Sequence, residues 1–266
     1  MQDSPPAAAA LRLERQGEIG VIIADNPSRM NALTASMWKA VPEVVAEAVG
    51  DDAIRVIVLR GAGSRAFSAG ADISEFDSVR SGAKAKDYDA LNDGAFRALS
   101  ECAKPTIAMI HGFCLGGGLG LALCTDIRLA DEGAEFAIPA AKLGLGYNAR
   151  WVRPLLAAVS SSRAKEMLFT GRRFKVAEAL AIGLVNEIAP AADLEARTRA
   201  LAQEIAANAP LTIRAAKRVI DALVRQPEGA DMEALDAAVA ACFDSEDYAE
   251  GRRAFLEKRK PQFKGR

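Results

Sequence analysis

Runs of apolar residues divide the chain into a strand-rich first half and a helix-rich second half. The apolar positions of LRLERQGEIGVIIAD predict two short strands joined by a turn at Gln16-Gly17. IRVIVLRG (54–61) and PTIAMIHG (105–112) are continuously apolar, which is typical of strands buried on both faces of a parallel sheet. DIRLADEGAEFAIP predicts two further short strands.

Helical patterns begin with TASMWKAVPEVVAEAVG, where Thr34 can cap the start and Gly50 can end the helix, while Pro42 predicts a kink or a broken first turn. From Ala149 onward most segments have helical periodicity, and the last one, EDYAEGRRAFLEKRK, is strongly charged. The polar stretch DSVRSGAKAKDYDALND predicts a mobile lid or a surface segment. Because no Pro/Gly-rich linker separates the halves, we expect one α/β domain with a helical C-terminal extension.

Composition narrows the classes of partner. The 266 residues include 34 Lys+Arg and 35 Asp+Glu, so the charge balance favours neither nucleic acid nor a membrane surface as a partner. No apolar run reaches the ~18 residues of a spanning helix. The N-terminus lacks the pattern of an export or organelle-targeting signal, which predicts a cytoplasmic protein. Four cysteines without CxxC spacing and a single histidine predict neither a disulfide framework nor a metal site.

Two glycine-rich loops carry the strongest chemical signal. GAGSRAFSAGADI (61–73) and HGFCLGGGLGLALCTD (111–126) each follow a predicted buried strand and lead into a predicted helix. Two such turns can direct two backbone N–H groups at one oxygen, which is what an oxyanion site requires. Two alternatives are tight turns without a ligand, and a dinucleotide site at GAGSRA, although no acid-ended strand follows at ~20 residues.

AFSAGADI and HGFCLGGGLGLALCTDIRLA resemble the crotonase (enoyl-CoA hydratase/isomerase) superfamily, as do NPSRMNALT, LFTGRRFKVAEALAIGLVNEI and FDSEDYAEGRRAFLEKRKPQFKG. The resemblance implies an α/β fold with a crotonase-type ββα spiral core and a helical C-terminal trimerisation region. It implies a flexible N-terminus (1–10), an acyl-CoA-binding core (11–195) and an oligomerisation region (196–266). The ligand would be an acyl-CoA thioester with no further cofactor. The assembly would be a homotrimer or a hexamer built from two trimers.

The same resemblance implies roles for individual residues. The oxyanion donors would be the N–H groups of Ala71 and Gly117, and a tyrosine of LGLGYNARW, Tyr147, would act in catalysis. The remaining residues would contact the substrate or its CoA portion: Arg29, Ala69, Asp72, Ile73, Gly116 and, across a subunit interface, Phe255 and Lys258. For Asp72 a helix cap is the alternative, and for Phe255 and Lys258 it is a solvated amphipathic helix. An aromatic wall of the acyl pocket is the alternative for Tyr147.

Two acids that the resemblance would lead one to expect are absent. Family hydratases carry a glutamate at the positions of Gly120 and Ala140, and neither residue can move a proton. Asn148 stands where a dienoyl-CoA isomerase holds an aspartate. Tyr147-Asn148 resembles methylmalonyl-CoA decarboxylases, although these carry a histidine at position 71 and a glutamate at position 120. Three functions therefore remain open: hydration by other groups, decarboxylation of a malonyl-type thioester, and acyl-CoA binding without catalysis.

Three further residues receive structural interpretations. His111, the only histidine, is interpreted as structural rather than as a general base. Asp131 and Glu135 are expected to face solvent on polar turns.

Overall fold

The computed structural model describes residues 9–76, 84–225 and 228–266. Its first half contains the predicted strands and first helix, together with two strands, β4 and β6, that the sequence did not predict and with short 3-10 turns. The elements have the following bounds: β1 (Ala10–Gln16), β2 (Ile19–Asp25), η1 (Pro27–Arg29), α1 (Ala35–Gly50), β3 (Val56–Gly61), β4 (Ala66–Ser68), η2 (Ile73–Glu75), α3 (Lys84–Ser100), β5 (Thr106–Ile110), β6 (Phe113–Leu115), α4 (Gly117–Leu123), β7 (Ile127–Asp131) and β8 (Glu135–Ala137).

The second half is mostly helical, as predicted, with two short strands inserted: η3 (Pro139–Leu143), α5 (Ala149–Ala158), α6 (Ser161–Thr170), β9 (Phe174–Lys175), α7 (Val176–Ala181), β10 (Glu187–Ala189), α8 (Leu194–Ala206), α9 (Pro210–Arg225), α10 (Met232–Phe243) and α11 (Glu246–Leu256). Of the predicted flexible N-terminus, residues 1–8 lie outside the described residues, and Ala10 already belongs to β1.

The strands form two sheets that the chain visits in turn. One sheet has the order β1-β2-β3-β5-β7-β10 and the other β4-β6-β8-β9. Each of the pairs β3/β4, β5/β6 and β7/β8 places its first strand in the larger sheet and its second in the smaller one, and a helix follows each pair. From β2 to β10 the larger sheet is parallel, which confirms the expectation drawn from the continuous apolar strands.

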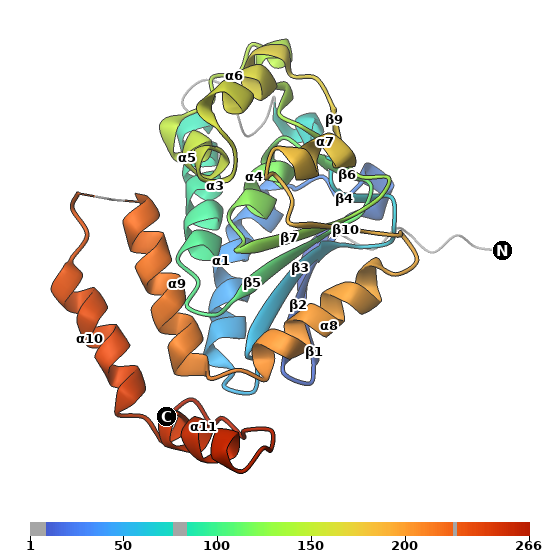
Figure 1. Cartoon of the computed structure of the whole chain (residues 1–266). Coiled ribbons are helices and arrows are strands. Elements are labelled where there is room, and N and C mark those ends of the chain that lie inside the picture. The colour runs from blue at the N-terminus through green and yellow to red at the C-terminus, as the bar shows by residue number, and fades with distance from the viewer. Residues whose placement is uncertain (1–8, 77–83, 226–227) are drawn as a thin grey trace.

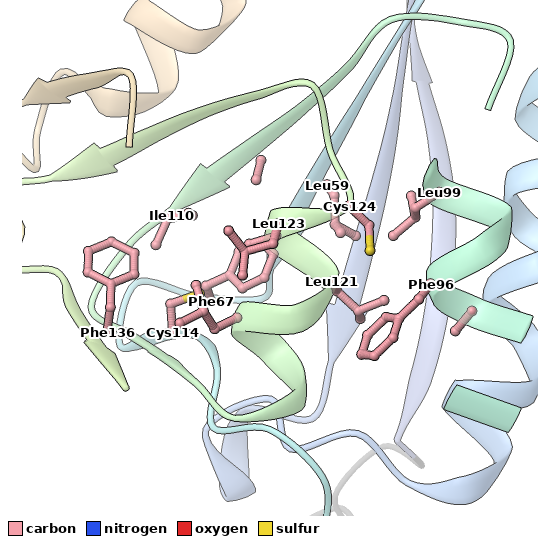
Figure 2. Close-up of a cluster of buried hydrophobic side chains, with 14 of the residues drawn as sticks. Leu59, Phe67, Phe96, Leu99, Ile110, Cys114, Leu121, Leu123, Cys124 and Phe136 are labelled. Atoms are coloured by element: carbon pink, nitrogen blue, oxygen red, sulfur yellow. The ribbon is translucent and has the colours of Figure 1, made fainter. Parts of the chain in front are cut away.

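Both faces of the larger sheet are buried, and this explains why its strands are apolar without alternation. Val56 and Val58 of β3 belong to a core shared with α8, while Ile57 and Leu59 belong to the core on the side of α1. Figure 1 shows α8 across the front of the sheet and α1 behind it. The glycine-rich helix α4 lies inside the second core (Figure 2), where its apolar side chains face those of the following neighbours: Phe67, Phe96, Leu99, Ile110, Cys114 and Phe136.

The last three helices extend away from the sheets (Figure 1) and leave apolar surface exposed. Together α9, α10 and α11 border a groove of about 820 Å³. Its lining includes Ile220 and Phe243, which are 61% and 60% exposed, and Phe255, which is 83% exposed. Among the helices that the structure describes, none has the length and apolar character needed to cross a bilayer.

The polar stretch 77–93 differs from its prediction. Residues 77–83 lie outside the described residues, but 84–93 form the first part of α3 instead of a mobile surface segment. Tyr88 and Asn92 of this part are 2% and 5% exposed, because α3 packs along α1. Pro42 also leaves α1 as one unbroken element from Ala35 to Gly50, with the Thr34 side chain capping its start as expected.

Candidate active site

The two glycine loops meet where β4 and β6 end. A Cβ added to Gly70 would lie 2.9 Å from the Leu115 carbonyl oxygen and 3.2 Å from the Gly117 backbone nitrogen. Gly70 also has a φ of +97°, a conformation that residues with side chains rarely adopt. Position 70 therefore requires glycine for its conformation and for the contact, and the loops that the sequence places far apart lie against each other.

The N–H of Ala71 is turned away from its neighbouring segment. Leu33 donates its N–H to the Gly70 carbonyl at 2.7 Å and accepts the N–H of Asp72 at 2.9 Å. Successive peptide groups of an extended segment point to opposite sides. The Ala71 N–H between these two bonds thus points away from Leu33, and its nitrogen lies 3.8 Å from the position of a Cβ on Gly117.

Gly117 offers a second donor beside the first. It is the first residue of α4, so its N–H has no acceptor within the helix. Across the described parts of the chain, neither this N–H nor that of Ala71 is paired with an acceptor. Both residues are partly exposed. Two unpaired donors on partly exposed residues at one place suit an oxygen on which negative charge develops.

An aromatic ring accounts for the glycine at position 117. A Cβ there would lie 2.8 Å from Cζ2 of Trp38, a side chain of α1 that is fully buried. The sequence alone suggested that glycine was needed so that the backbone could approach a ligand. The structure adds that Trp38 occupies the side-chain position, and no local pattern in the sequence could signal this contact between α1 and α4.

Some of the residues expected along the CoA path lie close together in the structure. Ala69 donates its N–H to the Met30 carbonyl at 2.9 Å, and Arg29 Nη1 lies 3.7 Å from Asp72 Oδ1. Of the two interpretations of Asp72, the structure shows the cap, because its carboxylate accepts the N–H and hydroxyl of Ser74. Ile73 is 58% exposed.

Gly116 directly precedes α4 and is partly exposed. Phe255 and Lys258 lie on and just after α11, far from β4 and β6 within one chain (Figure 1), so the chain by itself does not bring them to the glycine loops.

Tyr147 ends a row of aromatic rings beside α4. Trp38 contacts Phe96 at 5.7 Å between ring centroids, Phe96 contacts Trp151 at 6.2 Å, and Trp151 contacts Tyr147 at 5.5 Å, each edge to face. Burial raises the pKa of the Tyr147 hydroxyl above its ordinary value, and charge on the Cys124 thiol acts in the same direction. Tyr147 is therefore a neutral phenol at physiological pH and a weaker acid than an ordinary tyrosine.

Apolar groups surround Gly120 and Ala140, the two positions at which the resemblance would place acids. A Cβ on Gly120 would lie 2.6 Å from Cζ of Phe96, so the ring stands where a side chain at 120 would begin. Ala140 is buried in η3. Asn148 acts as the cap of α5, because its side-chain oxygen accepts the N–H groups of Arg150 and Trp151.

His111 and Asp131 differ in how well the sequence predicted them. His111 is buried, and burial, followed by the charge of Arg60, lowers its pKa, which agrees with a structural role. The expectation that Asp131 faces solvent is wrong. Its carboxylate is buried and accepts the N–H of Gly112, between β5 and β6, and the N–H of Gly133, between β7 and β8, so it joins the two turns. Glu135 forms ion pairs with Arg173 and Lys175.

Alkaline pH should destabilise this region through its buried thiol. Burial raises the pKa of Cys124 to about 11, whereas an unfolded thiol titrates near ~8.5. Between these values the unfolded chain binds fewer protons than the folded one, so the free energy of unfolding should fall as pH rises, by at most ~3 kcal/mol from this group. Chemical denaturation from pH 7 to 11 measures the fall.

In Cys124→Ala the slope of that fall should be smaller, and Cys242→Ala serves as the control for the loss of a thiol on α10. An unchanged slope in Cys124→Ala would contradict the assignment.

Comparison with known proteins gives a consistent result. The family model described as enoyl-CoA hydratase/isomerase matches residues 14–266. The chain is 33% identical to the short-chain-enoyl-CoA hydratase of Clostridium acetobutylicum, covering 96% of this chain and 97% of that one. It is 35% identical to the carnitinyl-CoA dehydratase of Salmonella typhi, covering 97% and 99%.

Among solved structures, an enoyl-CoA hydratase/isomerase family protein from Hyphomonas neptunium superposes with a TM-score of 0.92 at 38% identity, covering 96% and 98% of the two chains. The α/β fold with a parallel-sheet core and surrounding helices is therefore of the kind that the sequence predicted.

Proposed function

The chain belongs to the enoyl-CoA hydratase/isomerase family, and from this premise we propose that it binds an acyl-CoA thioester and stabilises the enolate of that thioester with the N–H groups of Ala71 and Gly117. The observation that carries the proposal is the pair of unpaired donors on two touching loops. A thioester enolate places negative charge on the carbonyl oxygen, and fixed donors lower the barrier to forming it.

The CoA portion would pass over the loop that follows β4. Arg29 is 57% exposed at its side chain and supplies a cation for phosphate, while its pairing with Asp72 holds the guanidinium near the loop. Ala69, Ile73 and Gly116 would border the path of the thioester. We infer no cofactor beyond the CoA that the substrate itself carries.

Decarboxylation of a malonyl-type thioester is the second candidate, and the apolar groups at positions 120 and 140 favour it over two-glutamate hydration. In this reaction the bond from the α-carbon to the carboxylate breaks and its electron pair forms the enolate as CO₂ leaves. No base is needed. The hydroxyl of Tyr147, which is protonated at physiological pH, would then give its proton to the α-carbon and regain one from solvent. Acyl-CoA binding without catalysis is the remaining alternative.

We also propose that further copies of the chain cover the apolar groove of α9, α10 and α11 as a homotrimer or hexamer. The exposed apolar side chains around that groove support this, since such patches are rare on monomers. In such an assembly, Phe255 and Lys258 of one copy would reach the CoA bound to another.

A mass-spectrometric screen tests the proposal. The purified protein is offered crotonyl-CoA, longer enoyl-CoAs, methylmalonyl-CoA and malonyl-CoA, and loss of CO₂ from a malonyl-type substrate is expected to exceed hydration. Tyr147→Phe should then slow the decarboxylation by ~10²-fold or more, the value typical of a positioned proton donor. Affinity for none of these thioesters would refute the proposed function, whereas full turnover by Tyr147→Phe would remove only Tyr147.

A further inference from the structure

The turn before α1 contains two consecutive left-handed residues that are not glycine. Met30 has a φ of 52° and Asn31 a φ of 55°. Such conformations cost energy and persist where the surroundings fix them. Asn31 is 1% exposed, so this asparagine is a buried polar residue in the middle of a strained turn.

The Asn31 side chain ties this turn to the beginning of the first glycine loop. Its Nδ2 donates to the carbonyl of Ala62 at 2.9 Å and to that of Ala66 at 2.7 Å. Its Oδ1 accepts the N–H of Asn26 at 3.1 Å. The side-chain amide of Asn31 thus joins the turn, to which Asn26 belongs, to the connection from β3 to β4, which begins at Ala62 and ends at Ala66.

The backbone of the same turn continues the contact up to the proposed oxyanion donor. Four hydrogen bonds join the two segments: Ala69 N–H to Met30 O at 2.9 Å, Ser68 Oγ to Asn31 O at 2.8 Å, Leu33 N–H to Gly70 O at 2.7 Å and Asp72 N–H to Leu33 O at 2.9 Å. These bonds flank Ala71 on both sides and leave its own N–H outside the ladder. The direction of that N–H is therefore set by the turn.

We propose that Asn31 is a positioning residue for the Ala71 N–H, and this inference rests on the proposed function. Asn31 does not contact the thioester. Its side chain fixes the start of the loop and its left-handed backbone turns the Asn31 carbonyl toward Ser68. The motif NPSRMNALT would thus serve the oxyanion site through residue 31, besides carrying Arg29.

Asn31→Asp tests the inference. Aspartate has nearly the same shape and tolerates the left-handed conformation, but it lacks both donors and places an oxygen against the Ala62 and Ala66 carbonyls. The probe is acetoacetyl-CoA, whose enolate has its own absorbance band. A CoA thioether of similar length, which has no carbonyl oxygen, reports CoA binding alone.

We expect Asn31→Asp to bind acetoacetyl-CoA ~10–10²-fold more weakly, with a weaker enolate band, because the loss of one hydrogen bond to a charged oxygen has an effect of that size. Thioether affinity should not change. A purely structural defect would weaken both ligands equally. Asn31→Gly keeps the backbone conformation without any side-chain bond, and it replaces the aspartate variant if that one does not fold.

Asn26→Asp is the matched control. Asn26 is a buried asparagine of the same turn, but within the described ranges its Nδ2 donates to Ala32 O, at 2.8 Å, and not to the glycine loop. Equal losses in Asn26→Asp and Asn31→Asp, or unchanged enolate binding in Asn31→Asp, would overturn the inference alone. If the unsubstituted protein bound neither probe, the proposed function would fail and this inference with it.

Discussion

Gly70→Ala is expected to reduce turnover of the accepted CoA thioester by ~10²–10³-fold, the loss typical of removing one oxyanion donor. The added Cβ would lie 2.9 Å from the Leu115 carbonyl and 3.2 Å from the Gly117 nitrogen, and all of these atoms belong to backbone that cannot rotate away. The two loops must therefore separate, and the distance between the Ala71 and Gly117 donors must grow. Steady-state kinetics with the substrate found in the screen measures the effect.

The same substitution should also lower the free energy of unfolding, by about 1–3 kcal/mol, because alanine disfavours a φ of +97°. Gly17→Ala separates this strain from the loss of geometry. Gly17 has a φ of +66° in the turn between β1 and β2, and nothing lies within 4 Å of a Cβ there. The Gly17→Ala variant should be less stable than the unsubstituted protein and should keep its turnover. Wild-type turnover in Gly70→Ala would show that the two loops do not act together.

Most of the fold could be predicted because it depends on local pattern and on burial. Continuous apolar runs such as IRVIVLRG indicated strands covered on both faces, and β3 is covered by α8 on one face and α1 on the other. Thr34 capped its helix as expected because capping needs only neighbouring backbone groups. The glycine-rich loops could also be recognised in the sequence, because several glycines close together are tolerated where backbones approach closely.

What the sequence did not reveal depends on contacts between distant segments. Phe96 fills the position beside Gly120, yet the segment that carries this ring follows a polar stretch that gave no sign of a buried helix face. Asp131 is on a polar turn in sequence, but the chain buries it because Gly112 and Gly133 both donate to it. In the sequence Asn31 is a single polar residue of a turn, and its hydrogen bonds to the Ala62 and Ala66 carbonyls are seen only in the folded structure.

Gly120→Glu is expected to destabilise the protein rather than to restore hydration. A Cβ at position 120 would lie 2.6 Å from Cζ of Phe96 and 3.0 Å from its Cε1, so the carboxylate and the ring would compete for one space. Overpacking of this kind costs ~1–3 kcal/mol, and a buried carboxylate without a partner adds to the loss. Thermal or chemical unfolding measures the cost, and the rate of crotonyl-CoA hydration should not rise.

Removing the ring should relieve this conflict, and a double-mutant cycle shows whether it does. Phe96→Ala alone should cost ~3–5 kcal/mol through the cavity that it leaves. In Phe96→Ala with Gly120→Glu, the glutamate side chain occupies that cavity, so the double variant should be more stable than the sum of the single losses by ~1–3 kcal/mol.

Gly50→Glu is the matched control, because Gly50 is the exposed last residue of α1 and nothing lies within 4 Å of a Cβ there. Its effect should be small and should not change when Phe96 is shortened. Strict additivity between positions 96 and 120 would contradict the contact. A Gly120→Glu protein as stable as the unsubstituted chain and active as a hydratase would show that position 120 accepts an acid while Phe96 is still present. The interaction energy between positions 96 and 120 therefore shows whether the Phe96 ring fills the space that a glutamate side chain at position 120 would need.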